Sequence, residues 1–565
     1  MHHTLKKTSL LLLAWLLLFL LAGCSQAPAP GDPFRDLQTE QYQISDQAQA
    51  TFLFLSYLEL QEQEPEKALE HLQDALEKDP HPELYLELAQ FYWSRQEHEQ
   101  AEELLLQARR KFPQHADLVQ ALARLYNNQE QEQKARDTLR LFLMEQPEEP
   151  RVRSRLAELQ LEHGLPEQAL NTLEKLQKED LNARMHLLMG RAYLKLDNRQ
   201  EAVQQLRQAT ELNPRFVRAW AELAYQYELN RDYVQARDSY QRLLQLGMDN
   251  QEVYIRLIDI SLKLNNPEQA LQTVQEGPDS ENFLLQACNL FLQQDFFEQA
   301  KEILEQMQEK GYASPRQDLL QAILAYKGDQ DSQQALEILE GIPEDSEYFE
   351  RGLDLQARLL YQMNMQDQAL EKTRQGRETF PENQRFWLLE SEILQQKDQL
   401  QESKKLTSKA LEKFPEDSEI LYQMGFIQHQ LEEEEQALEF MEKVINQDPE
   451  YAPALNFVGY SLAEQGQDLQ RALILIKKAL QEDPENGFYL DSLAWVYFRS
   501  GNLEQAWEHI QKAVEQVQDD PIIWEHYGDI AAELNKQEQA REAYQKSLEL
   551  DPKNARELED KLDSL

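Results

Sequence analysis

Three carboxylates in the middle of the chain have roughly the spacing of a calcium-binding loop. Asp329, Asp331 and Glu340 could supply the oxygen ligands that Ca²⁺ prefers. Such a loop needs glycine at its sharp turn, but Gln334 stands there, and residues 335–339 have the pattern of a helix. We therefore expect no calcium site here and no metal-binding residues in the chain.

Nucleophilic or acid–base catalysis has no better support. Cys288 could act as a thiolate, but it occupies a position that is alanine or glycine in related segments, so a buried small residue is the simpler interpretation. The nine histidines after His3 are scattered along the chain, and no glycine-rich phosphate loop, His-Glu-x-x-His pair or nucleophile elbow occurs. We expect neither catalytic residues nor a cofactor, so the enzyme class is the least favoured.

Cys24 has a different chemical setting. It follows a start with two lysines, an apolar run over residues 10–21 and the small pair Ala22-Gly23. This arrangement resembles the lipobox that the lipoprotein signal peptidase cleaves. The resemblance implies that residues 1–23 are a signal peptide and that Cys24 becomes the lipid-bearing first residue, with diacylglycerol on its thiol and a fatty acid such as palmitate on its amine. An uncleaved membrane anchor is the alternative, because the run is nearly long enough to span a bilayer.

The residues around this cysteine also bear on location and partners. Ser25 is not the aspartate that retains lipoproteins at the inner membrane of enteric bacteria, which favours the periplasmic side of the outer membrane. Residues 24–46 then form an acylated, proline-rich tether. The net charge of −45 becomes −47 without the two leader lysines. We therefore expect that the protein does not bind nucleic acid, and that it contacts the membrane through the lipid anchor only. Cys288 is left without a disulfide partner.

A repeat dominates the rest of the sequence. Alanine returns about every 34 residues, with serine once in its place. These fifteen anchor positions are Ala68, Ala101, Ala135, Ala169, Ala202, Ala236, Ala270, Ala300, Ala335, Ala369, Ser403, Ala437, Ala472, Ala506 and Ala540. A regular period of this length is the mark of a stack of like units.

Two further positions repeat with the anchors. A small residue stands twelve positions before most of them, or thirteen in the case of Gly459: Ala89, Ala123, Ala157, Gly190, Ala224, Cys288, Ala357, Ser391, Gly425, Ala494 and Gly528. Proline follows many anchors by twelve positions, at Pro80, Pro113, Pro147, Pro214, Pro381, Pro415, Pro449, Pro484 and Pro552, where it must end a helix. Apolar residues recur at helical spacing on both sides of each anchor. Each unit is therefore predicted to be a pair of close-packed helices.

This pattern resembles the tetratricopeptide repeat (TPR) over about residues 47–552. The resemblance implies an all-α, right-handed solenoid of about fifteen TPR helical hairpins. We divide the chain into an N-terminal array over residues 47–276, irregular repeats with a possible bend over 277–348, a C-terminal array over 349–552 and a charged capping helix over 553–565.

The resemblance also implies that the first helix of each hairpin lines the concave groove of the solenoid. The positions six, three and two before the small residue and one after it form one face of that helix, called here the groove stripe. In the N-terminal array this stripe contains seven arginines: Arg124, Arg151, Arg155, Arg184, Arg191, Arg218 and Arg256. They could clamp carboxylates of a peptide partner, or pair internally with Glu158, Glu222 and Asp259 on the same stripe.

The C-terminal array has a different stripe. Phe426, Tyr460 and Trp495 each follow a small residue directly, and polar groups stand close to them. The polar members are Asn456, Asp491, Ser492, Glu525 and His526. We expect this cluster to be a peptide-binding hot spot, the alternative being that the aromatic rings only fill a tight superhelix.

Residues 455–529 carry a more specific resemblance. Asn456 before Gly459-Tyr460, Asp491-Ser492 before Trp495 and Glu525-His526 before Gly528 look like the end of large TPR lipoproteins of Gram-negative bacteria. One such group comprises outer-membrane adaptors that bind a periplasmic carboxyl-terminal processing protease and deliver cell-wall hydrolases to it. The resemblance implies a non-catalytic adaptor with periplasmic protein partners. A structural scaffold for envelope assembly or polysaccharide export is the alternative.

Overall fold

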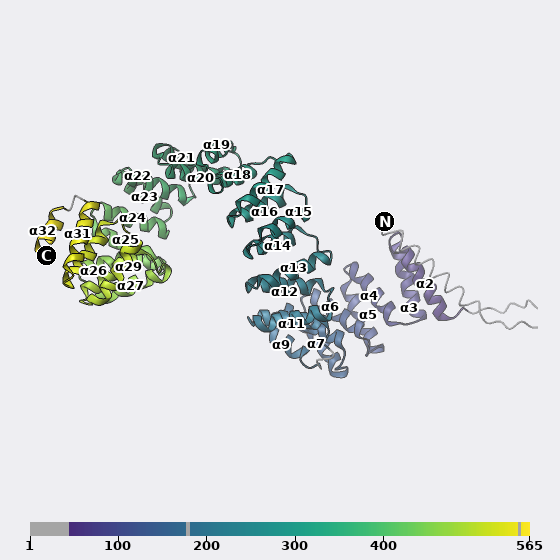
Figure 1. The fold of residues 1–565 in the computed structure, drawn as a ribbon. Helices are drawn as coiled ribbons and strands as arrows, with labels where there is room; N and C mark the ends of the chain where they lie inside the picture. The colour runs from purple at the N-terminus through teal and green to yellow at the C-terminus, as the bar shows by residue number, and fades with distance from the viewer. Residues whose placement is uncertain (1–43, 177–180, 552–554) are drawn as a thin grey trace, which may run out of the picture. The chain divides into compact units, whose positions relative to one another are not determined.

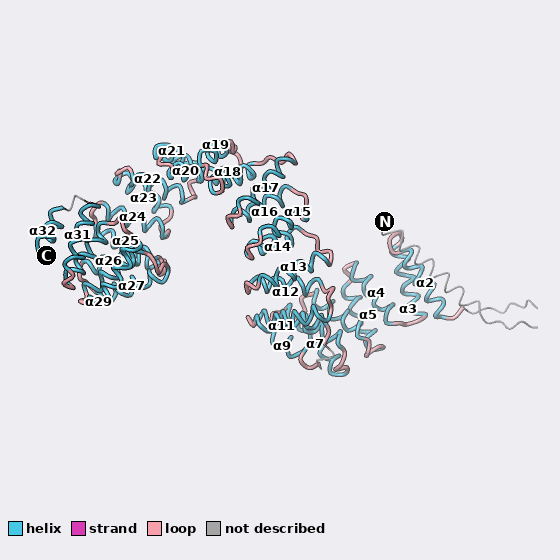
Figure 2. Tube along the Cα trace, viewed as in Figure 1, coloured by secondary structure: helices cyan, strands magenta, loops and turns pink. Residues whose placement is uncertain are grey.

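The computed structural model describes residues 44–176, 181–551 and 555–565. The proposed signal peptide, Cys24 and nearly all of the tether lie outside these residues. Within the described residues the chain forms 31 helices and no strand (Figure 2). They pair into fifteen successive hairpins followed by one last helix, so the predicted all-α solenoid of about fifteen TPR hairpins is confirmed (Figure 1).

Helix bounds repeat from hairpin to hairpin. The first helices are α2 (Asp46–Leu60), α4 (Pro82–Ser94), α6 (Ala116–Asn128), α8 (Pro150–Glu162), α10 (Ala183–Lys195), α12 (Val217–Leu229), α14 (Gln251–Lys263), α16 (Glu281–Gln293), α18 (Pro315–Lys327), α20 (Phe349–Gln362), α22 (Gln384–Gln396), α24 (Ser418–Gln430), α26 (Ala452–Glu464), α28 (Gly487–Arg499) and α30 (Pro521–Glu533).

The second helices are α3 (Pro65–Lys78), α5 (His98–Lys111), α7 (Glu132–Glu145), α9 (Pro166–Leu173), α11 (Arg199–Leu212), α13 (Tyr233–Gln245), α15 (Pro267–Glu276), α17 (Phe297–Glu309), α19 (Ser332–Glu340), α21 (Gln366–Thr379), α23 (Leu400–Lys413), α25 (Glu434–Gln447), α27 (Leu469–Glu482), α29 (Leu503–Gln516) and α31 (Gln537–Leu550). The last helix is α32 (Ala555–Ser564). The chain divides into two compact units, residues 1–226 and 227–565.

The anchor positions are the centre of each hairpin. All fifteen anchor side chains, the fourteen alanines and Ser403, are 0% exposed. The small residues opposite them explain why the two helices can approach so closely. A Cβ atom on Gly459 would lie 2.6 Å from Cγ1 of Ile476 on the second helix, and one on Gly190 would lie 2.9 Å from Cγ of Leu206. Cys288 takes the same position, with its Sγ 3.8 Å from the carbonyl oxygen of Ala300.

A left-handed residue joins the two helices of most hairpins. In the hairpin of α6 and α7, Glu130 has φ of 60°, and the N–H of Gln131 donates to the carbonyl of Tyr126 at 2.9 Å. This closes the end of the first helix in the manner of a Schellman turn. The residues with positive φ at this turn are Gln96, Glu130, Gly164, Asp197, Arg231, Asn265, Asp295, Gln330, Asn364, Asp398, Glu432, Gly466, Gly501 and Asn535. Glycine is the usual sequence signal for a residue with positive φ. Because only three of these residues are glycine, the sequence pattern did not predict the turn.

The two places where the repeat loses its register fall beside short second helices. α15 has ten residues and α19 has nine, where most second helices have thirteen or fourteen. Asp331, considered above as a calcium ligand, caps the start of α19 by accepting a hydrogen bond from the N–H of Gln334 at 2.9 Å. A bend over residues 277–348 stays a prediction.

The C-terminal end of the array is covered by α32. Leu558 is 1% exposed and packs with Ala531, Ala540 and Tyr544. Lys561 donates to Glu525 at 2.7 Å and to Asp529 at 2.9 Å, which ties α32 to α30. None of the helices in the described ranges is long and apolar enough to cross a membrane.

Candidate functional site

Groove-stripe positions on successive first helices line two adjoining cavities in the unit of residues 1–226. One cavity of about 480 Å³ lies between α4, α5 and α6, and one of about 410 Å³ lies between α6, α8 and the start of α10. They share Asp117, Gln120, Arg124 and Asn128 of α6. On α8 the four stripe positions are Arg151, Ser154, Arg155 and Glu158, and all four line the second cavity.

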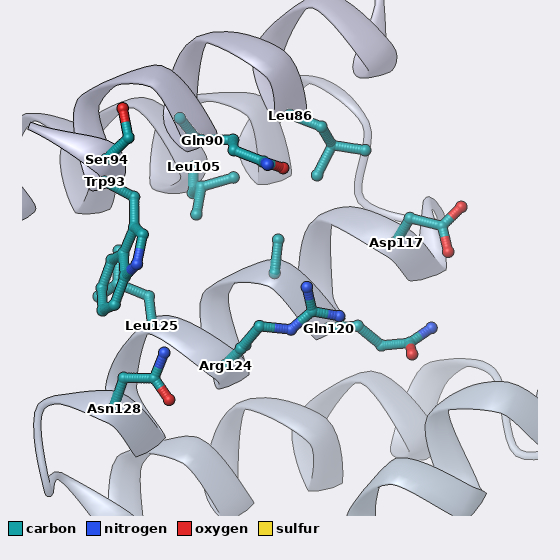
Figure 3. Close-up of a pocket in the computed structure, with 12 residues that line it drawn as sticks. Leu86, Gln90, Trp93, Ser94, Leu105, Asp117, Gln120, Arg124, Leu125 and Asn128 are labelled. Atoms are coloured by element: carbon teal, nitrogen blue, oxygen red, sulfur yellow. The ribbon is translucent and has the colours of Figure 1, made fainter. Parts of the chain in front are cut away.

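The first cavity combines an apolar wall with polar groups. Leu86, Trp93 and Leu105 contribute apolar surface from α4 and α5. Figure 3 shows Trp93 from α4 and Arg124 from α6 on the border of this cavity. Six of its twelve lining residues are polar or charged, so the cavity offers both apolar surface and hydrogen-bonding groups to a side chain of a partner.

Most arginines of the stripe form ion pairs within the chain. Nη1 of Arg151 lies 3.2 Å from Oδ1 of Asp117, across the second cavity. Arg155 and Arg184 both contact Glu158, at 2.7 and 2.9 Å. Burial by itself would raise the pKa of the Glu158 carboxyl, but these two arginines outweigh it and hold the pKa below its ordinary value.

Two further stripe arginines are paired in the same way. Arg191 contacts Glu222, with Nε at 2.8 Å, and Arg256 contacts Glu228 at 2.8 Å. Asp259, expected among the internal partners, instead binds Lys263 at 2.7 Å. Internal pairing therefore accounts for five of the seven arginines.

Arg124 and Arg218 are the exceptions. Both are exposed, and neither has an ion pair with another described residue. Arg218 lies at the start of α12, whereas Arg124 lies where the two cavities meet. Four arginines and two carboxylates line the second cavity, so its wall has a formal excess of two positive charges in a chain with a net charge of −45. Arg124 is therefore the arginine whose charge is best placed for a partner.

The aromatic row of the C-terminal array is not uniformly exposed, contrary to the hot-spot expectation. Phe426 is 38% exposed and stacks on Tyr422 with ring centroids 6.3 Å apart. Tyr460 is half-buried, and burial raises the pKa of its hydroxyl. Trp495 is only 7% exposed, because its ring stacks on His526 at 3.9 Å between α28 and α30. Trp495 is thus a packing residue in this structure.

The polar residues beside that row are also largely internal. Nδ1 of buried His526 lies 2.9 Å from Oδ1 of buried Asp491. Burial alone would lower the pKa of His526, but the charge of Asp491 and the hydrogen bond to it outweigh burial and raise the pKa. Ser492 is 3% exposed, and Glu525 is held by Lys561.

Asn456 differs from these residues because its Oδ1 is buried and has no hydrogen-bond partner within the described part of the chain. An unpaired buried acceptor of this kind costs free energy, on the order of 1–3 kcal/mol. Of the polar cluster, Asn456 is therefore the member with unused hydrogen-bonding capacity.

Two exposed apolar residues on this stripe were missed. Phe488 on α28 is 50% exposed and Ile522 on α30 is 51% exposed. Each stands six positions before its small residue, as Arg151 and Arg184 do on α8 and α10. The spacing therefore carried the signal, but the sequence prediction rested on charged residues in one array and on residues directly after glycine or alanine in the other.

No described residues are arranged to bind a metal ion. Nowhere among them do three or more His, Cys, Asp or Glu side chains lie together so that they could hold one. Cys288 is fully buried, and desolvation raises the pKa of its thiol to about 12. It is therefore poorly suited to act as a nucleophile.

Comparison with known proteins identifies the repeat along both units. Sequence models described as tetratricopeptide repeat match residues 59–125, 128–192, 187–251, 229–283, 418–451 and 492–555. The TPR repeat-containing protein PA4667 of Pseudomonas aeruginosa is 34% identical over 71 residues, which is 13% of this chain and 12% of that protein. The chain therefore matches about an eighth of the length of this relative.

Two solved structures are similar to this chain over different shares of its length. The Cut9–Hcn1 hetero-tetramer of the APC/C contains a chain that is 15% identical, with 91% of this chain and 96% of that chain covered and a TM-score of 0.37. A structure from the characterisation of Pseudomonas aeruginosa pilF is 22% identical, with 34% and 89% covered and a TM-score of 0.30.

Proposed function

This chain is a tetratricopeptide-repeat protein, and from that premise we propose that it is a non-catalytic scaffold that binds other proteins. The observation that carries the proposal is the pair of adjoining cavities on α4, α6, α8 and α10, which are lined by the stripe positions that the repeat spacing selects. The first helices of four successive hairpins then present side chains along one path, as binding of an extended peptide requires.

The chemistry of the cavities suggests what that peptide offers. An apolar side chain of the partner enters the cavity beside Leu86 and Trp93, while a carboxylate pairs with Arg124. The other arginines on this path are held by Asp117 and Glu158, so they shape the groove more than they bind the partner.

The test is site-specific photo-crosslinking in cells. A crosslinking residue in place of Gln120, inside the groove, is expected to capture a partner protein, whereas the same residue in place of exposed Gln107 on α5 is not. Arg124→Ala should weaken capture, more strongly at low salt, because screening already weakens exposed charge pairs at high salt. Arg110→Ala removes an equally exposed arginine outside the groove and serves as the matched control. Equal capture from both positions, or equal loss with both alanine variants, contradicts groove binding.

We also propose that the scaffold is anchored to the outer membrane through acylated Cys24, on the periplasmic side. The leader and lipobox-like residues support this, and they lie outside the described part of the structure. The Cys24→Ala variant should accumulate as an uncleaved precursor. A normally processed, soluble Cys24→Ala protein would overturn the lipoprotein proposal.

The finer proposal is an adaptor that holds a periplasmic carboxyl-terminal processing protease and its cell-wall hydrolase substrates together. Two chemically unlike stripes support it: the arginine-rich cavities before residue 227 and exposed apolar residues such as Phe426, Phe488 and Ile522 after it. A scaffold of this kind raises the effective concentration of its two partners without a catalytic group.

The adaptor predicts separable losses of binding. The measurement is the identification of partners that co-purify with the lipidated protein. The double variant Phe488→Ser with Ile522→Ser should lose binding of one partner, and Arg124→Ala should lose binding of the other. Loss of both partners with either variant, in a folded protein, would favour a structural scaffold for envelope assembly or polysaccharide export instead.

A further inference from the structure

The two carboxylates that line the second cavity, Glu158 and Asp117, are held to different degrees. Glu158 binds two arginines, and its side chain is only 19% exposed. Asp117 pairs with Arg151 at 3.2 Å, and the side chains of this pair are 47% and 64% exposed. A pair of exposed charges is held weakly, because water solvates both groups and screens their attraction. Glu158 is therefore a fixed part of the wall, whereas Asp117 can leave Arg151 at little cost.

Arg151 does not depend on Asp117 for its position. Its Nε lies 3.3 Å from Oε1 of Glu149, which directly precedes α8 and lines neither cavity. Asp117 contacts a different nitrogen of the same guanidinium, Nη1. If Asp117 turns away, Nη1 is therefore freed for another acceptor while Nε keeps its contact.

Asp117 also lies on the same face of α6 as Arg124. Together with Gln120 they follow the helical spacing i, i+3 and i+7, and Figure 3 shows the three side chains along α6. Asp117 and Arg124 both line both cavities. A partner carboxylate that pairs with Arg124 therefore enters a cavity that already contains the carboxylate of Asp117. The repulsion between these like charges favours release of Asp117.

We propose that Asp117 is an internal competitor for a groove partner, and that a partner peptide binds by replacing it on Arg151 with a carboxylate of its own. This inference rests on the groove binding proposed above, and it adds Arg151 to Arg124 as an arginine that the partner reaches. In the free chain Asp117 occupies the place that a partner carboxylate takes in the complex. The released side chain turns into solvent, to which it is already half-exposed.

The competitor specifies the chemistry of the partner. The wall of the second cavity has a formal excess of two positive charges, which two partner carboxylates balance. One pairs with Arg124, and the other replaces Asp117 on Arg151. Because the two cavities share four residues, the acidic pair lies close to the apolar side chain that enters the first cavity. The partner segment is therefore a large apolar residue next to a pair of acidic residues.

Asp117 also gives the groove a means to reject weaker ligands. A peptide with one carboxylate pairs with Arg124 but leaves Asp117 in place, so it meets repulsion without a contact to Arg151. A peptide with no carboxylate leaves the pair of Asp117 and Arg151 intact. A repulsive group built into a binding site is a common source of specificity.

The test begins with a phage-displayed library of random peptides, selected on the purified full chain. We expect the enriched peptides to carry a large apolar residue close to two acidic residues, and one of them, fluorescently labelled, is the probe for affinity measurements. Asp117→Asn should bind this probe about threefold to fivefold more tightly, because it removes a competitor with the strength of an exposed ion pair. In the Arg151→Ala background the same change should give a clearly smaller gain, because the arginine that Asp117 blocks is gone.

Asp137→Asn is the matched control. The side chain of Asp137 is 49% exposed and lies 3.4 Å from Nη1 of Arg140 on α7, in the same hairpin as α6. The change therefore removes the same charge from a similar ion pair, but Asp137 lines neither cavity. It should alter the affinity by less than about 1.5-fold. Measurement at about 0.15 M salt limits the general effect of net charge.

The outcomes separate this inference from the proposed function. Enrichment of no peptide, or of peptides that fail to crosslink from position 120, would overturn both. Enriched peptides that crosslink from position 120 but lack acidic residues would overturn the competitor and leave groove binding intact. The same conclusion would follow from an equal gain with Asp117→Asn and Asp137→Asn, or from a gain with Asp117→Asn that Arg151→Ala does not reduce.

Discussion

Trp495→Ala is the substitution that best separates a packing residue from a binding residue. The side chain is 7% exposed, its ring stacks on His526 at 3.9 Å, and its Nε1 donates to Oε2 of Glu464 at 2.6 Å. Removing a buried aromatic side chain costs about 3–5 kcal/mol, most of it from lost packing. The hydrogen bond adds only about 1 kcal/mol, because the Glu464 side chain is 53% exposed.

Native-state hydrogen exchange is the suitable assay. A long repeat array need not unfold in a single step, so one overall unfolding free energy is not defined for it. A local loss of about 3 kcal/mol corresponds to exchange roughly a hundred times faster in α28 and α30. Helices α4 to α10 are far along the array from the change and should be unaffected.

Phe426→Ala is the matched control. Phe426 also follows a small residue directly, but it is 38% exposed, so its truncation should cost about 1 kcal/mol and change exchange in α24 by less than about tenfold. If Trp495→Ala left exchange in α28 and α30 unchanged while abolishing partner binding, the assignment of Trp495 to packing would be refuted. The exposed hot spot expected from the sequence would then be correct.

The remaining predictions concern titration, crowding and reactivity. The folded-state pKa of His526 is raised above 6.5, so its ion pair with Asp491 stabilises α28 and α30 fully below pH 6.5 and loses that effect as the pH rises through the raised pKa. Amide exchange in these two helices, measured upward from pH 6 and corrected for its intrinsic pH dependence, should show this loss of local stability, and His526→Gln should remove it. Gly459→Ala should destabilise the hairpin of α26 and α27 by about 1–3 kcal/mol through overpacking, seen as faster local exchange, and unchanged exchange there would contradict the close approach. In a Cys24→Ser variant, the thiol of Cys288 should not react with a disulfide reagent at pH 8 in the folded chain, but it should react in denaturant. Reaction in the folded chain would show that the residue is accessible.

Much of the fold follows from residue spacing alone. Fifteen anchors and their small partners predict fifteen hairpins, since a helix repeats its faces every 3.6 residues and only small side chains allow two helices to touch. The same arithmetic selects Arg151 and Arg155 as groove residues, and both line a cavity. The left-handed turns within the hairpins were not predicted, because Asn, Asp, Gln and Glu occupy them more often than glycine.

The sequence by itself determined which face of each helix a residue occupies, because that depends only on its distance along the chain from the small residue. Only the tertiary structure decided what lies opposite that face. Arg184 meets Glu158 across two helices, Arg124 meets no carboxylate, and Trp495 is covered by His526 from the next hairpin. These outcomes depend on distances of a few ångströms between side chains of different hairpins, which helical spacing does not specify.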